Sequence, residues 1–461
     1  MAILGAAVVP HPPIILPEVG KGEERKIQHT IDAYREAMKR LAALKPDTVI
    51  LSSPHATMYA DYFQVSPGES AQGSFGMFRA PEVKISAKYD TEFVAQLEKQ
   101  CKSVYLAAGT LGERVPELDH GTMIPLRFLQ EYWTDFRLVR VGLSGLSPME
   151  HYTFGQCLAR TAALLGRRCV YIASGDLSHK LKEDGPYGFV PEGPVFDKEC
   201  TEALGGADFV RLLSTDAELS DAAAECGLRS FWIMAGALDR RAVKAELLSY
   251  EGTFGVGYGV VSFEVGGRDD SRNCGEQFEA AEKERLAERR AAEDIYVKLA
   301  RYSLETFVKT GERAAFPDRL PDFLTQEKAG VFVSLKKDGR LRGCIGTFMP
   351  REENIAAEIL HNAVSACSED PRFAPVRKSE LPSLVYSVDV LTTPEPAEFD
   401  ELDVKKYGVI VEAEDGRRGL LLPDLAGIDS VEEQVKIARQ KGNISPKEKV
   451  RLWRFEVVRH R

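Results

Sequence analysis

The chain has 461 residues, of which 44% are hydrophobic and 28% are charged, and its formal net charge is −10. A chain of this length is too long for one ordinary core, so two or three domains are expected. The acidic balance disfavours nonspecific binding to nucleic acid, and no apolar run reaches the roughly 18 residues that a membrane helix needs. The N-terminus has no basic segment ahead of its apolar residues, so we expect no signal peptide.

Strand-like and helix-like segments alternate from residue 3 to about residue 265. The apolar runs have the length and the β-branched content of strands that are buried on both faces, which is typical of α/β domains. Strands are predicted over 3–9, 47–53, 136–143, 167–176 and 247–265, and helices over 23–44 and 149–165. We assign residues 1–266 to an α/β domain with a mainly parallel or mixed central sheet flanked by helices.

The next segment is polar and rich in turn-forming residues, and we assign a linker to residues 267–284. A charged helix is predicted over 276–310, where it opens the second part of the chain. From residue 330 onward, strands and helices mix without βαβ regularity. This pattern favours a compact α+β domain, to which we assign residues 285–461.

The cysteines indicate the compartment. Eight cysteines are scattered along the chain, and no two form a Cys-x-x-Cys pair. In a chain of this size the pattern indicates a reducing environment and disfavours zinc fingers and iron–sulfur clusters. We therefore expect a cytoplasmic protein.

Four of the eight histidines share an unusual context. His11 follows the first strand in "VVPHPP", where the neighbouring prolines restrict its backbone. His55 and His179 follow later strands, and His120 lies in "ELDHGTMIPLRFL". The first two strands are joined by one long helix, and such a unit places parallel strands close together with their carboxyl ends on one edge. Because open α/β sheets bind ligands at that edge, we expect a shared site there.

The chemistry expected at this edge is metal binding. Two imidazoles suit a divalent transition metal, and a carboxylate would complete a facial triad with open positions. Glu225 is a plausible carboxylate because it lies next to a small, apolar helix, but the neighbouring Cys226 could ligate instead. Asp119 and Asp176 are further candidates, although each could equally cap a helix or orient a histidine. The residues alone leave the third ligand open.

The order of the motifs carries a family resemblance. "VVPHPP", "SSPHA", "LDHGTMIPL", "SGDLSHKL" and "AECGLRSF" occur in this order. Together they resemble the catalytic subunit of class III extradiol ring-cleavage dioxygenases, the LigB-like superfamily, over about residues 1 to 265. The Memo proteins belong to the same superfamily, and this half of the chain resembles them too.

The resemblance implies roles for five residues. His11, His55 and Glu225 would hold a non-haem Fe(II), His179 would act as acid and base near the substrate, and His120 would line the pocket. The implied activity is an Fe(II)-dependent oxygenase that uses O₂ to cleave a catechol-like or related aromatic substrate.

The Memo resemblance gives the alternative. In Memo proteins a cysteine takes the third ligand position, which would make Cys226 the ligand in place of Glu225. The chain would then be an accessory protein that binds iron, copper or another divalent metal. We favour Glu225, because the other members of the dioxygenase-type set are present.

The most distinctive stretch of the second half is "GRLRGCIGTFMP" (339–350). Arg342 and Cys344 are two residues apart, so on a strand they point to the same face. A guanidinium near a thiol lowers the thiol pKa, which would make Cys344 a nucleophile or a metal ligand. The alternative is a buried cysteine in a tight strand turn. A site with the acids Glu369, Asp370 and Asp389 is less favoured than a structural role for those carboxylates.

The second half also resembles a known family. "LRGCIGT", "DPRF", "YSVDVL", "YGVIVE" and "GLLLP" resemble the AMMECR domain family, over about residues 285 to 461. The resemblance implies an α+β fold with a groove around Arg342 to Thr347, and it brings no established reaction. The candidate site of this domain is therefore Arg342, Cys344 and Thr347.

The two resemblances together imply partners. A Memo-like and an AMMECR-like domain on one chain resemble a fusion of proteins B and A of the AmmeMemoRadiSam system, which implies a radical SAM protein as a partner. Basic and aromatic residues at 451–461 could contact RNA, but the acidic total favours a solvated surface. The sequence leaves a homo-oligomer open.

Overall fold

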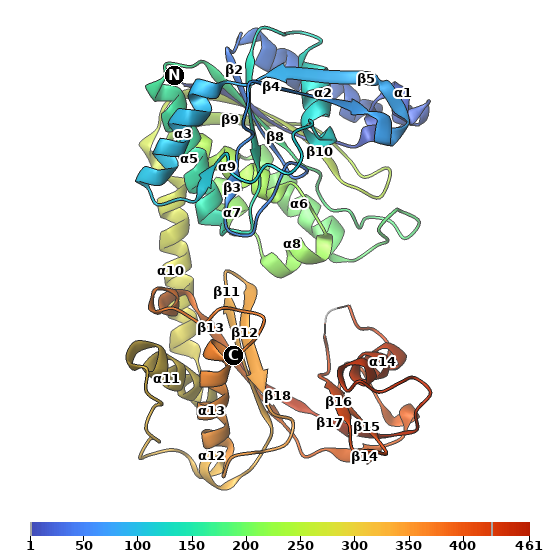
Figure 1. Ribbon diagram of the computed structural model, residues 1–461, viewed down its shortest axis with the longest axis vertical. Helices are drawn as coiled ribbons and strands as arrows, with labels where there is room; N and C mark the ends of the chain where they lie inside the picture. Colours follow the sequence, from blue (N-terminus) through green and yellow to red (C-terminus); the bar gives the residue numbers. More distant parts are fainter. Residues whose placement is uncertain (1, 426) are drawn as a thin grey trace. The chain divides into compact units, whose positions relative to one another are not determined.

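The computed structural model describes residues 2–425 and 427–461 of the chain (Figure 1). The chain divides into two compact units, Met1–Glu282 and Lys283–Arg461. We describe each unit by itself. Among the described residues, no helix is both long enough and apolar enough to cross a membrane.

In the described part of the chain, the first unit is built on a six-stranded sheet with the order β7-β2-β8-β1-β10-β9. Strands β7, β2, β8 and β1 are mutually parallel, whereas β10 is antiparallel to β1 and to β9. The prediction of a mainly parallel, mixed sheet is therefore confirmed. The strands are β1 (Ile3–Val9), β2 (Thr48–Ser53), β7 (Arg137–Gly142), β8 (Cys169–Ser174), β9 (Arg241–Glu251) and β10 (Tyr258–Arg268).

Both faces of this sheet are covered. Successive residues of a strand point to opposite faces, and in β1 Ala6 and Val8 join one buried cluster while Ala7 and Val9 join the other. The first cluster includes residues of α3 (Thr91–Ser103), α5 (Pro148–Leu164), α6 (Glu192–Gly205), α7 (Phe209–Leu213) and α9 (Leu228–Ala237). The second includes residues of α2 (Gln28–Ala43) and α4 (His120–Leu129). This double burial explains why the parallel strands are continuous apolar runs rather than alternating ones.

The strand order differs in one respect from the simplest expectation. The sequence suggested that β1 and β2 lie close together because one helix joins them. The structure instead places β8 between them, paired in parallel with both. The helical segment from residue 23 also begins differently: Glu23–Ile27 form a 3-10 helix, η2, and the α-helix starts at Gln28. The carboxyl ends of β1, β8 and β2 still lie on one edge.

Shorter elements complete the first unit. They are η1 (Pro13–Ile15), α1 (Pro17–Gly20), β3 (Phe63–Gln64), β4 (Ser70–Phe75), η3 (Gly76–Phe78), β5 (Ala80–Lys88), β6 (Ala108–Gly109), α8 (Ala217–Ala223) and η4 (Asp270–Arg272). Strands β4 and β5 form an antiparallel pair, and β3 pairs with β6 in parallel.

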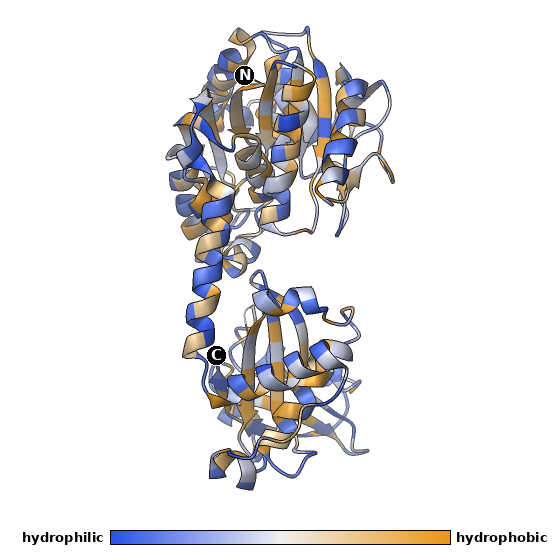
Figure 2. Cartoon of the chain, turned by 90° about the vertical axis from the view of Figure 1, so that its left-hand side faces the viewer, coloured by the Kyte–Doolittle hydropathy of each residue, from blue (hydrophilic) through white to orange (hydrophobic). Residues whose placement is uncertain are grey.

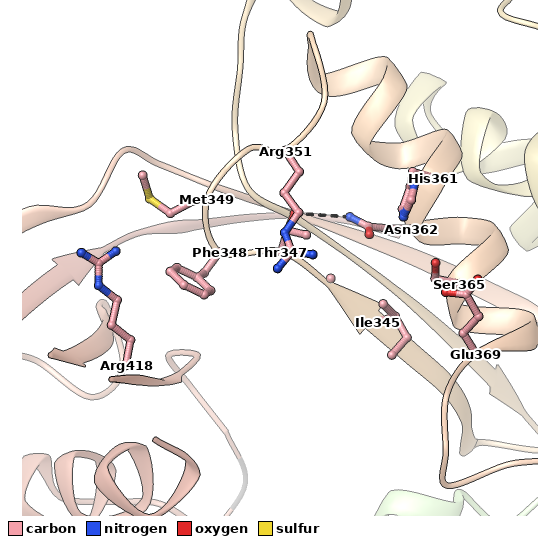
Figure 3. Close-up of a pocket in the computed structure, with 11 residues that line it drawn as sticks. Ile345, Thr347, Phe348, Met349, Arg351, His361, Asn362, Ser365, Glu369 and Arg418 are labelled. Atoms are coloured by element: carbon pink, nitrogen blue, oxygen red, sulfur yellow. Dashed lines mark hydrogen bonds between the residues drawn. The ribbon is translucent and has the colours of Figure 1, made fainter. Parts of the chain in front are cut away.

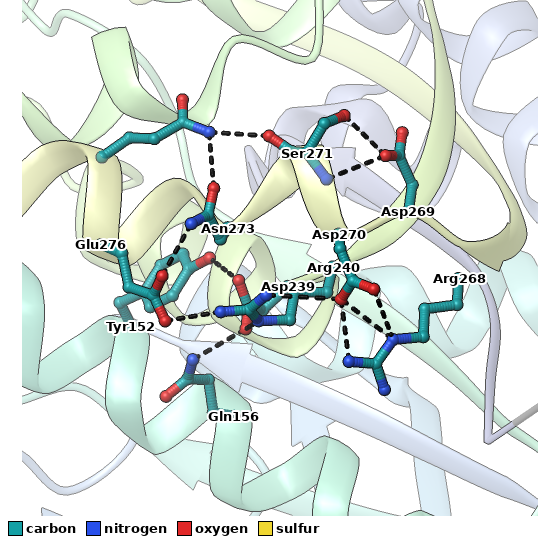
Figure 4. A network of polar contacts seen from close by, with 11 residues as sticks. Tyr152, Gln156, Asp239, Arg240, Arg268, Asp269, Asp270, Ser271, Asn273 and Glu276 are labelled. Atoms are coloured by element: carbon teal, nitrogen blue, oxygen red, sulfur yellow. Dashed lines mark hydrogen bonds and ion pairs between the residues drawn. The ribbon is translucent and has the colours of Figure 1, made fainter.

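The segment predicted as a linker, 267–284, contains η4 and the start of α10 (Cys274–Ala292). Arg240 donates hydrogen bonds to Asp270 and to Glu276, and so ties both elements to the end of α9 (Figure 4). The adjacent Asp239 accepts hydrogen bonds from Tyr152 at 2.6 Å and from Gln156 at 2.9 Å. These contacts hold the start of α10 against the first unit.

The charged helix predicted over 276–310 is two helices, α10 and α11 (Ile295–Thr310). The helical segment is interrupted at Asp294, which is the N-cap of α11. Its carboxylate accepts hydrogen bonds from the backbone N–H groups of Tyr296 and Val297. The adjacent Glu293 accepts from the buried guanidinium of Arg301. Helix α10 is mostly hydrophilic along its length (Figure 2), as its sequence indicates.

The second unit contains two antiparallel four-stranded sheets with the orders β12-β11-β13-β18 and β14-β17-β15-β16, as far as the described residues go. Helices α11 and α13 (Ile355–Ser368) share a buried cluster with the first sheet, and α14 (Val431–Lys441) shares one with the second. The α+β prediction is therefore confirmed. The other elements are α12 (Asp322–Gln326), β11 (Val331–Lys337), β12 (Arg340–Gly346), η5 (Lys378–Ser383), β13 (Val385–Leu391), β14 (Glu395–Ala397), η6 (Phe399–Glu401), β15 (Gly408–Ala413), β16 (Arg418–Leu421), β17 (Val450–Phe455) and β18 (Val457–His460).

Candidate metal centre

Three of the predicted histidines meet at the carboxyl edge of the parallel strands. His11 and His55 lie two residues beyond β1 and β2, and His120 is the first residue of α4. The Nε2 atoms of His11 and His55 are 3.0 Å apart. The ring of His120 lies 4.0 Å from that of His55 and 5.5 Å from that of His11, measured between centroids. One nitrogen from each ring lies within 4.8 Å of the others, which is the spacing of a set that could hold one metal ion.

The orientation of His11 is fixed from two sides. Its backbone N–H donates to Asp176 Oδ1 at 2.8 Å, and its Nδ1 lies 3.0 Å from the Oγ of Ser174, the last residue of β8. Because Nδ1 is engaged by this hydroxyl, Nε2 is the nitrogen left to face the cluster. The sequence leaves Asp176 as a candidate ligand or orienting residue. In the structure its carboxylate accepts the hydrogen bond from the His11 backbone N–H.

The orientation of His120 depends on Asp119, which caps α4. The Asp119 carboxylate accepts from Thr122 N at 2.9 Å, from Ser53 Oγ at 2.6 Å and from the buried guanidinium of Arg140 at 2.9 Å. Burial raises the pKa of Asp119, but Arg140 and the hydroxyl groups outweigh it, so that its pKa is lowered overall. The charged Asp119 carboxylate is therefore the N-cap that fixes the start of the helix carrying His120.

The donor set fits a transition metal. Burial, with a smaller contribution from His55, lowers the pKa of His11 to about 3, and the same two causes lower that of His120 to about 3. Both rings are therefore neutral at physiological pH, and the neutral imidazole is the form that binds metals. Imidazole nitrogens suit iron, copper, zinc and nickel. His55 is exposed, so the cluster is open to solvent.

Glu225 does not join this cluster. Its carboxylate accepts a hydrogen bond from Leu228 N, at the start of α9, at 2.7 Å and from Ser220 Oγ at 3.0 Å. Burial raises its pKa. The carboxylate thus stabilises the turn into α9, and its assignment as a metal ligand stays a prediction that this geometry does not favour. The third side chain of the cluster, beside His11 and His55, is that of His120.

Cys226 lies closer to the histidines than Glu225 does. Its Sγ is 3.7 Å from His11 Nε2, and it accepts a hydrogen bond from Asp176 N at 3.3 Å. Two glycines allow the loop that carries Cys226 to approach the end of β8. A Cβ on Gly175 would lie only 2.1 Å from the Cα of Gly227, so the two backbones are in direct contact. Burial raises the pKa of the Cys226 thiol well above its usual value. A metal would therefore have to displace a proton to bind this sulfur.

His179 lies beyond β8 on the same edge, with its backbone N–H donating to Ala223 O at 3.0 Å. Its ring stacks on that of Tyr187 at 5.2 Å between centroids. Its Nε2 is buried and has no hydrogen-bond partner within residues 2–425 and 427–461. Burial lowers the pKa of this ring, and the opposing charge of Asp176 offsets only part of that effect. A buried, unpartnered ring nitrogen is available to a bound molecule.

The candidate residues of the second unit are largely engaged in structure. Arg342 donates from Nε and Nη2 to the two carboxylate oxygens of Glu380, at 2.8 and 3.0 Å. The Sγ of Cys344 accepts from Ser334 Oγ at 3.1 Å. The pairing of β11 with β12 skips Arg342, so this residue is a β-bulge. Side chains no longer alternate regularly at the bulge, and the expectation that Arg342 and Cys344 share one face of the strand depended on that alternation.

The glycines of the same stretch serve packing. A Cβ on Gly343 would lie 2.2 Å from Ala366 O in α13, and one on Gly346 would lie 2.3 Å from the Phe332 ring. Strand β12 therefore needs both glycines to sit against the helix and the neighbouring strand. Thr347 differs from Arg342 and Cys344, because it lines a pocket.

Sequence reasoning did not find two supporting residues, Ser174 and Arg140. Ser174 ends an apolar strand and Arg140 lies inside one, so neither stands out as functional. The charge of Arg140 in an otherwise apolar run was the available signal, since a buried arginine requires an anionic partner.

The comparisons with known proteins agree with the two units. Residues 5–261 match the family described as the catalytic LigB subunit of aromatic ring-opening dioxygenase, and residues 297–460 match the AMMECR1 family. Protein CA_C1420 of Clostridium acetobutylicum is 42% identical over 481 residues, covering 100% of both chains. A Thermotoga maritima protein is 47% identical over 172 residues, covering 37% of this chain and 98% of its own.

A solved structure is also similar. The uncharacterized protein PH0010 of Pyrococcus horikoshii is 33% identical and covers 36% of this chain and 88% of its own, with a TM-score of 0.33. The family matches and the full-length Clostridium relative carry the assignment. The chain belongs to the LigB family, and its LigB domain is fused to an AMMECR1 domain.

Proposed function

We propose that the LigB domain is a non-haem iron-dependent oxygenase that acts on a catechol-like or related aromatic substrate. The observation that carries the proposal is the cluster of the His11, His55 and His120 imidazoles beside the unpartnered Nε2 of His179. His11, His55 and His120 would hold the iron. When bound, iron would supply the redox chemistry that ring opening with O₂ requires.

The side chains around the cluster indicate what kind of substrate could bind there. His55 is exposed, and the ring of Phe78 lies edge-on to His120 at 5.2 Å between centroids. An aromatic substrate that reached the cluster would therefore contact ring faces and edges rather than charged groups. This environment suits a flat aromatic ring.

His179 would handle the proton of the substrate. Since its pKa is lowered, the ring is neutral in the free protein, and Nε2 can accept a proton from a catechol hydroxyl. The backbone hydrogen bond to Ala223 and the stacking on Tyr187 hold the ring in place for this transfer. After ring opening, the same nitrogen can return the proton to the product.

Oxygen consumption tests the proposal. Protein loaded anaerobically with Fe(II) should consume O₂ in the presence of catechol or of one of its carboxylated or alkylated derivatives. His179→Gln should retain iron but lose most of the activity, because it removes the proton acceptor and leaves the cluster intact. His29→Gln, on the exposed side of α2, is the matched control. An iron-loaded protein that consumes no O₂ with any member of the panel would refute the oxygenase.

Cys226 favours a second function, that of a Memo-like metal-binding accessory protein. Its Sγ is the non-imidazole donor that lies 3.7 Å from His11 Nε2. In this version iron or copper would bind through His11, His55 and Cys226, and the protein would serve a radical SAM partner. Cys226→Ala should then abolish metal binding, whereas Glu225→Ala should leave it intact. The reverse result would exclude this version.

A further inference from the structure

The second unit contains a pocket of about 390 Å³ that the proposed oxygenase does not use. It lies between the end of β12, one face of α13 and the start of β16 (Figure 3). Its size falls within the range of small-molecule sites. The lining residues comprise an apolar group (Ile345, Phe348 and Met349), three basic side chains (Arg351, His361 and Arg418) and a polar group (Thr347, Asn362, Ser365 and Glu369).

A polar stripe on α13 forms one wall of the pocket. Asn362, Ser365 and Glu369 are spaced i, i+3 and i+7, so they share one face of the helical segment. Asn362 and Ser365 are 1% and 2% exposed, in a helix whose other buried side chains are mostly apolar. The Asn362 amide nitrogen donates to Val331 O at 3.0 Å, and Asn362 and Ser365 both line the pocket. Their side chains therefore offer hydrogen-bonding groups to a ligand in the pocket, an amide oxygen from Asn362 and a hydroxyl from Ser365.

The loop opposite this stripe is held in place by a buried carboxylate. Glu358 is 1% exposed, and it accepts hydrogen bonds from the backbone N–H groups of Arg351 and Glu352, both at 2.8 Å. The hydroxyl of Thr347 also donates to it. Residues 347–352 are therefore fixed without any ligand, and they present Phe348 and Arg351 to the pocket (Figure 3).

Arg351 is the unpaired cation of the pocket. Arg418 donates to Glu412, and His361 lies 3.3 Å from Glu352. The guanidinium of Arg351 has no ion-pair or hydrogen-bond partner in residues 2–425 and 427–461, and Figure 3 shows it among the other lining side chains. An unpaired guanidinium suits a carboxylate or a phosphate, to which it can donate two hydrogen bonds.

We propose that this pocket binds an organic phosphate or carboxylate of about nucleotide size that carries hydroxyl groups. Arg351 holds the anionic group, Phe348 packs against the flat part of the ligand, and the hydroxyl groups bond to Asn362, Ser365 and Glu369. The pocket is a binding site of the AMMECR1 domain, and the residues that line it all come from that domain.

Calorimetric titration of the full chain with three matched probes tests the proposal. The probes are adenosine 5′-monophosphate, adenosine 5′-carboxylate and adenosine, which share the flat part and the hydroxyl groups but differ in the anion. At least one of the two anions should bind, and adenosine should bind roughly tenfold more weakly. The stronger of the two anions identifies the phosphate or the carboxylate as the natural group. Failure of both anions to bind at millimolar concentration would overturn the proposal, as would adenosine binding as tightly as they do.

Variants place the binding in this pocket. Arg351→Gln should weaken anion binding roughly tenfold, and Ser365→Ala should weaken it several-fold, since each removes one donor from the lining. Arg319→Gln, at an exposed arginine outside the pocket, is the matched control and should leave the affinity unchanged. Thermal unfolding of each variant shows whether the second unit stays folded. A folded Arg351→Gln variant with unchanged affinity would overturn the proposal.

Discussion

The histidine cluster of the LigB domain and the glycine-rich stretch of the AMMECR1 domain are equally conspicuous in the sequence, but they have different roles in the structure. His11 and His55 follow buried strands, His120 begins a helix, and the three side chains converge. The hydrogen bonds that support them come from Ser174 and from the cap Asp119. In the stretch 339–350, Arg342 is held by Glu380, and Gly343 and Gly346 allow close packing.

Histidines at strand ends and glycines within a strand therefore need different interpretations. Titratable side chains that follow strands of one parallel sheet share an edge, so their convergence follows from topology. Glycines in a strand mark close approach of backbones, and the ligand-binding residues then lie around them rather than among them. In the AMMECR1 domain these residues are Thr347 and Arg351, just beyond the glycines, and the polar face of α13.

The largest expected effect is the loss of the metal from the cluster. His55→Ala removes one of three ligands at an exposed position, so the metal affinity should fall by more than about 100-fold while the fold persists. Metal analysis after dialysis measures this. His29→Ala is the control, and equal metal content in both variants would contradict a site built on strand-end histidines.

The two buried histidines should give the first unit a pH-dependent stability. The pKa values of His11 and His120 are about 3 in the folded protein, below their ordinary value of 6.5. Between pH 6.5 and about 3 the unfolded chain therefore binds protons that the folded chain does not, and the free energy of unfolding should fall as the pH falls through this window.

Chemical denaturation of metal-free protein at several pH values checks this expectation. The slope should be up to about 1.4 kcal/mol per pH unit for each histidine. His120→Asn should reduce the slope, because one of the two groups no longer titrates. A slope that is unchanged in this variant would mean that other groups cause the acid sensitivity.

Removal of the hydroxyl that orients His11 should have a smaller effect than removal of a ligand. Ser174→Ala deletes the group that lies 3.0 Å from His11 Nδ1. Loss of such a supporting contact typically weakens metal binding by about 10- to 100-fold. Competition with a chelator measures the affinity, and Ser174→Thr, which keeps the hydroxyl, should recover part of it. An affinity equal to that of the unmodified protein would show that packing alone fixes the ring.

The smallest expected effect concerns the glycine motif. In Gly343→Ala the new methyl group would meet Ala366 O at 2.2 Å, so β12 would have to shift away from α13. The second unit should lose about 1–3 kcal/mol of stability, as in other overpacked cores, while metal binding by the first unit is unchanged. Thermal unfolding measures the loss. Gly267→Ala, where no heavy atom lies within 4 Å of the added group, is the control. A normal unfolding temperature in Gly343→Ala would contradict the packing role.

Much of the fold could be predicted because burial and periodicity are local signals. The first strand occupies Ile3–Val9 as expected, and β2, β7 and β8 lie within a few residues of their predicted bounds. The insertion of β8 between β1 and β2 could not be predicted, because all three are continuous apolar runs and nothing in their composition distinguishes neighbours. The break at Glu293 and Asp294 depends on a cap and an ion pair, which a helical pattern does not reveal.

The candidate site was predictable to a similar extent. Strand ends identified His11, His55 and His179, and the resemblance assigned His120 to the pocket. Whether Glu225 or Cys226 faces the histidines depends on the backbone direction in one turn, where adjacent side chains point apart. The contact between Gly175 and Gly227 sets that direction, and it joins segments about 50 residues apart in the chain.

The most direct test of the metal centre is the metal content of anaerobically purified protein, measured beside the variants His120→Ala, Glu225→Gln and Cys226→Ala. Three imidazoles as ligands predict about one iron per chain in the unmodified protein, retention in Glu225→Gln and Cys226→Ala, and loss in His120→Ala. The glutamine oxygen can still accept from Leu228 N, and its amide nitrogen can donate to Ser220 Oγ, so this variant separates ligation from folding. Iron that is lost in Glu225→Gln and retained in His120→Ala would contradict the three-histidine centre.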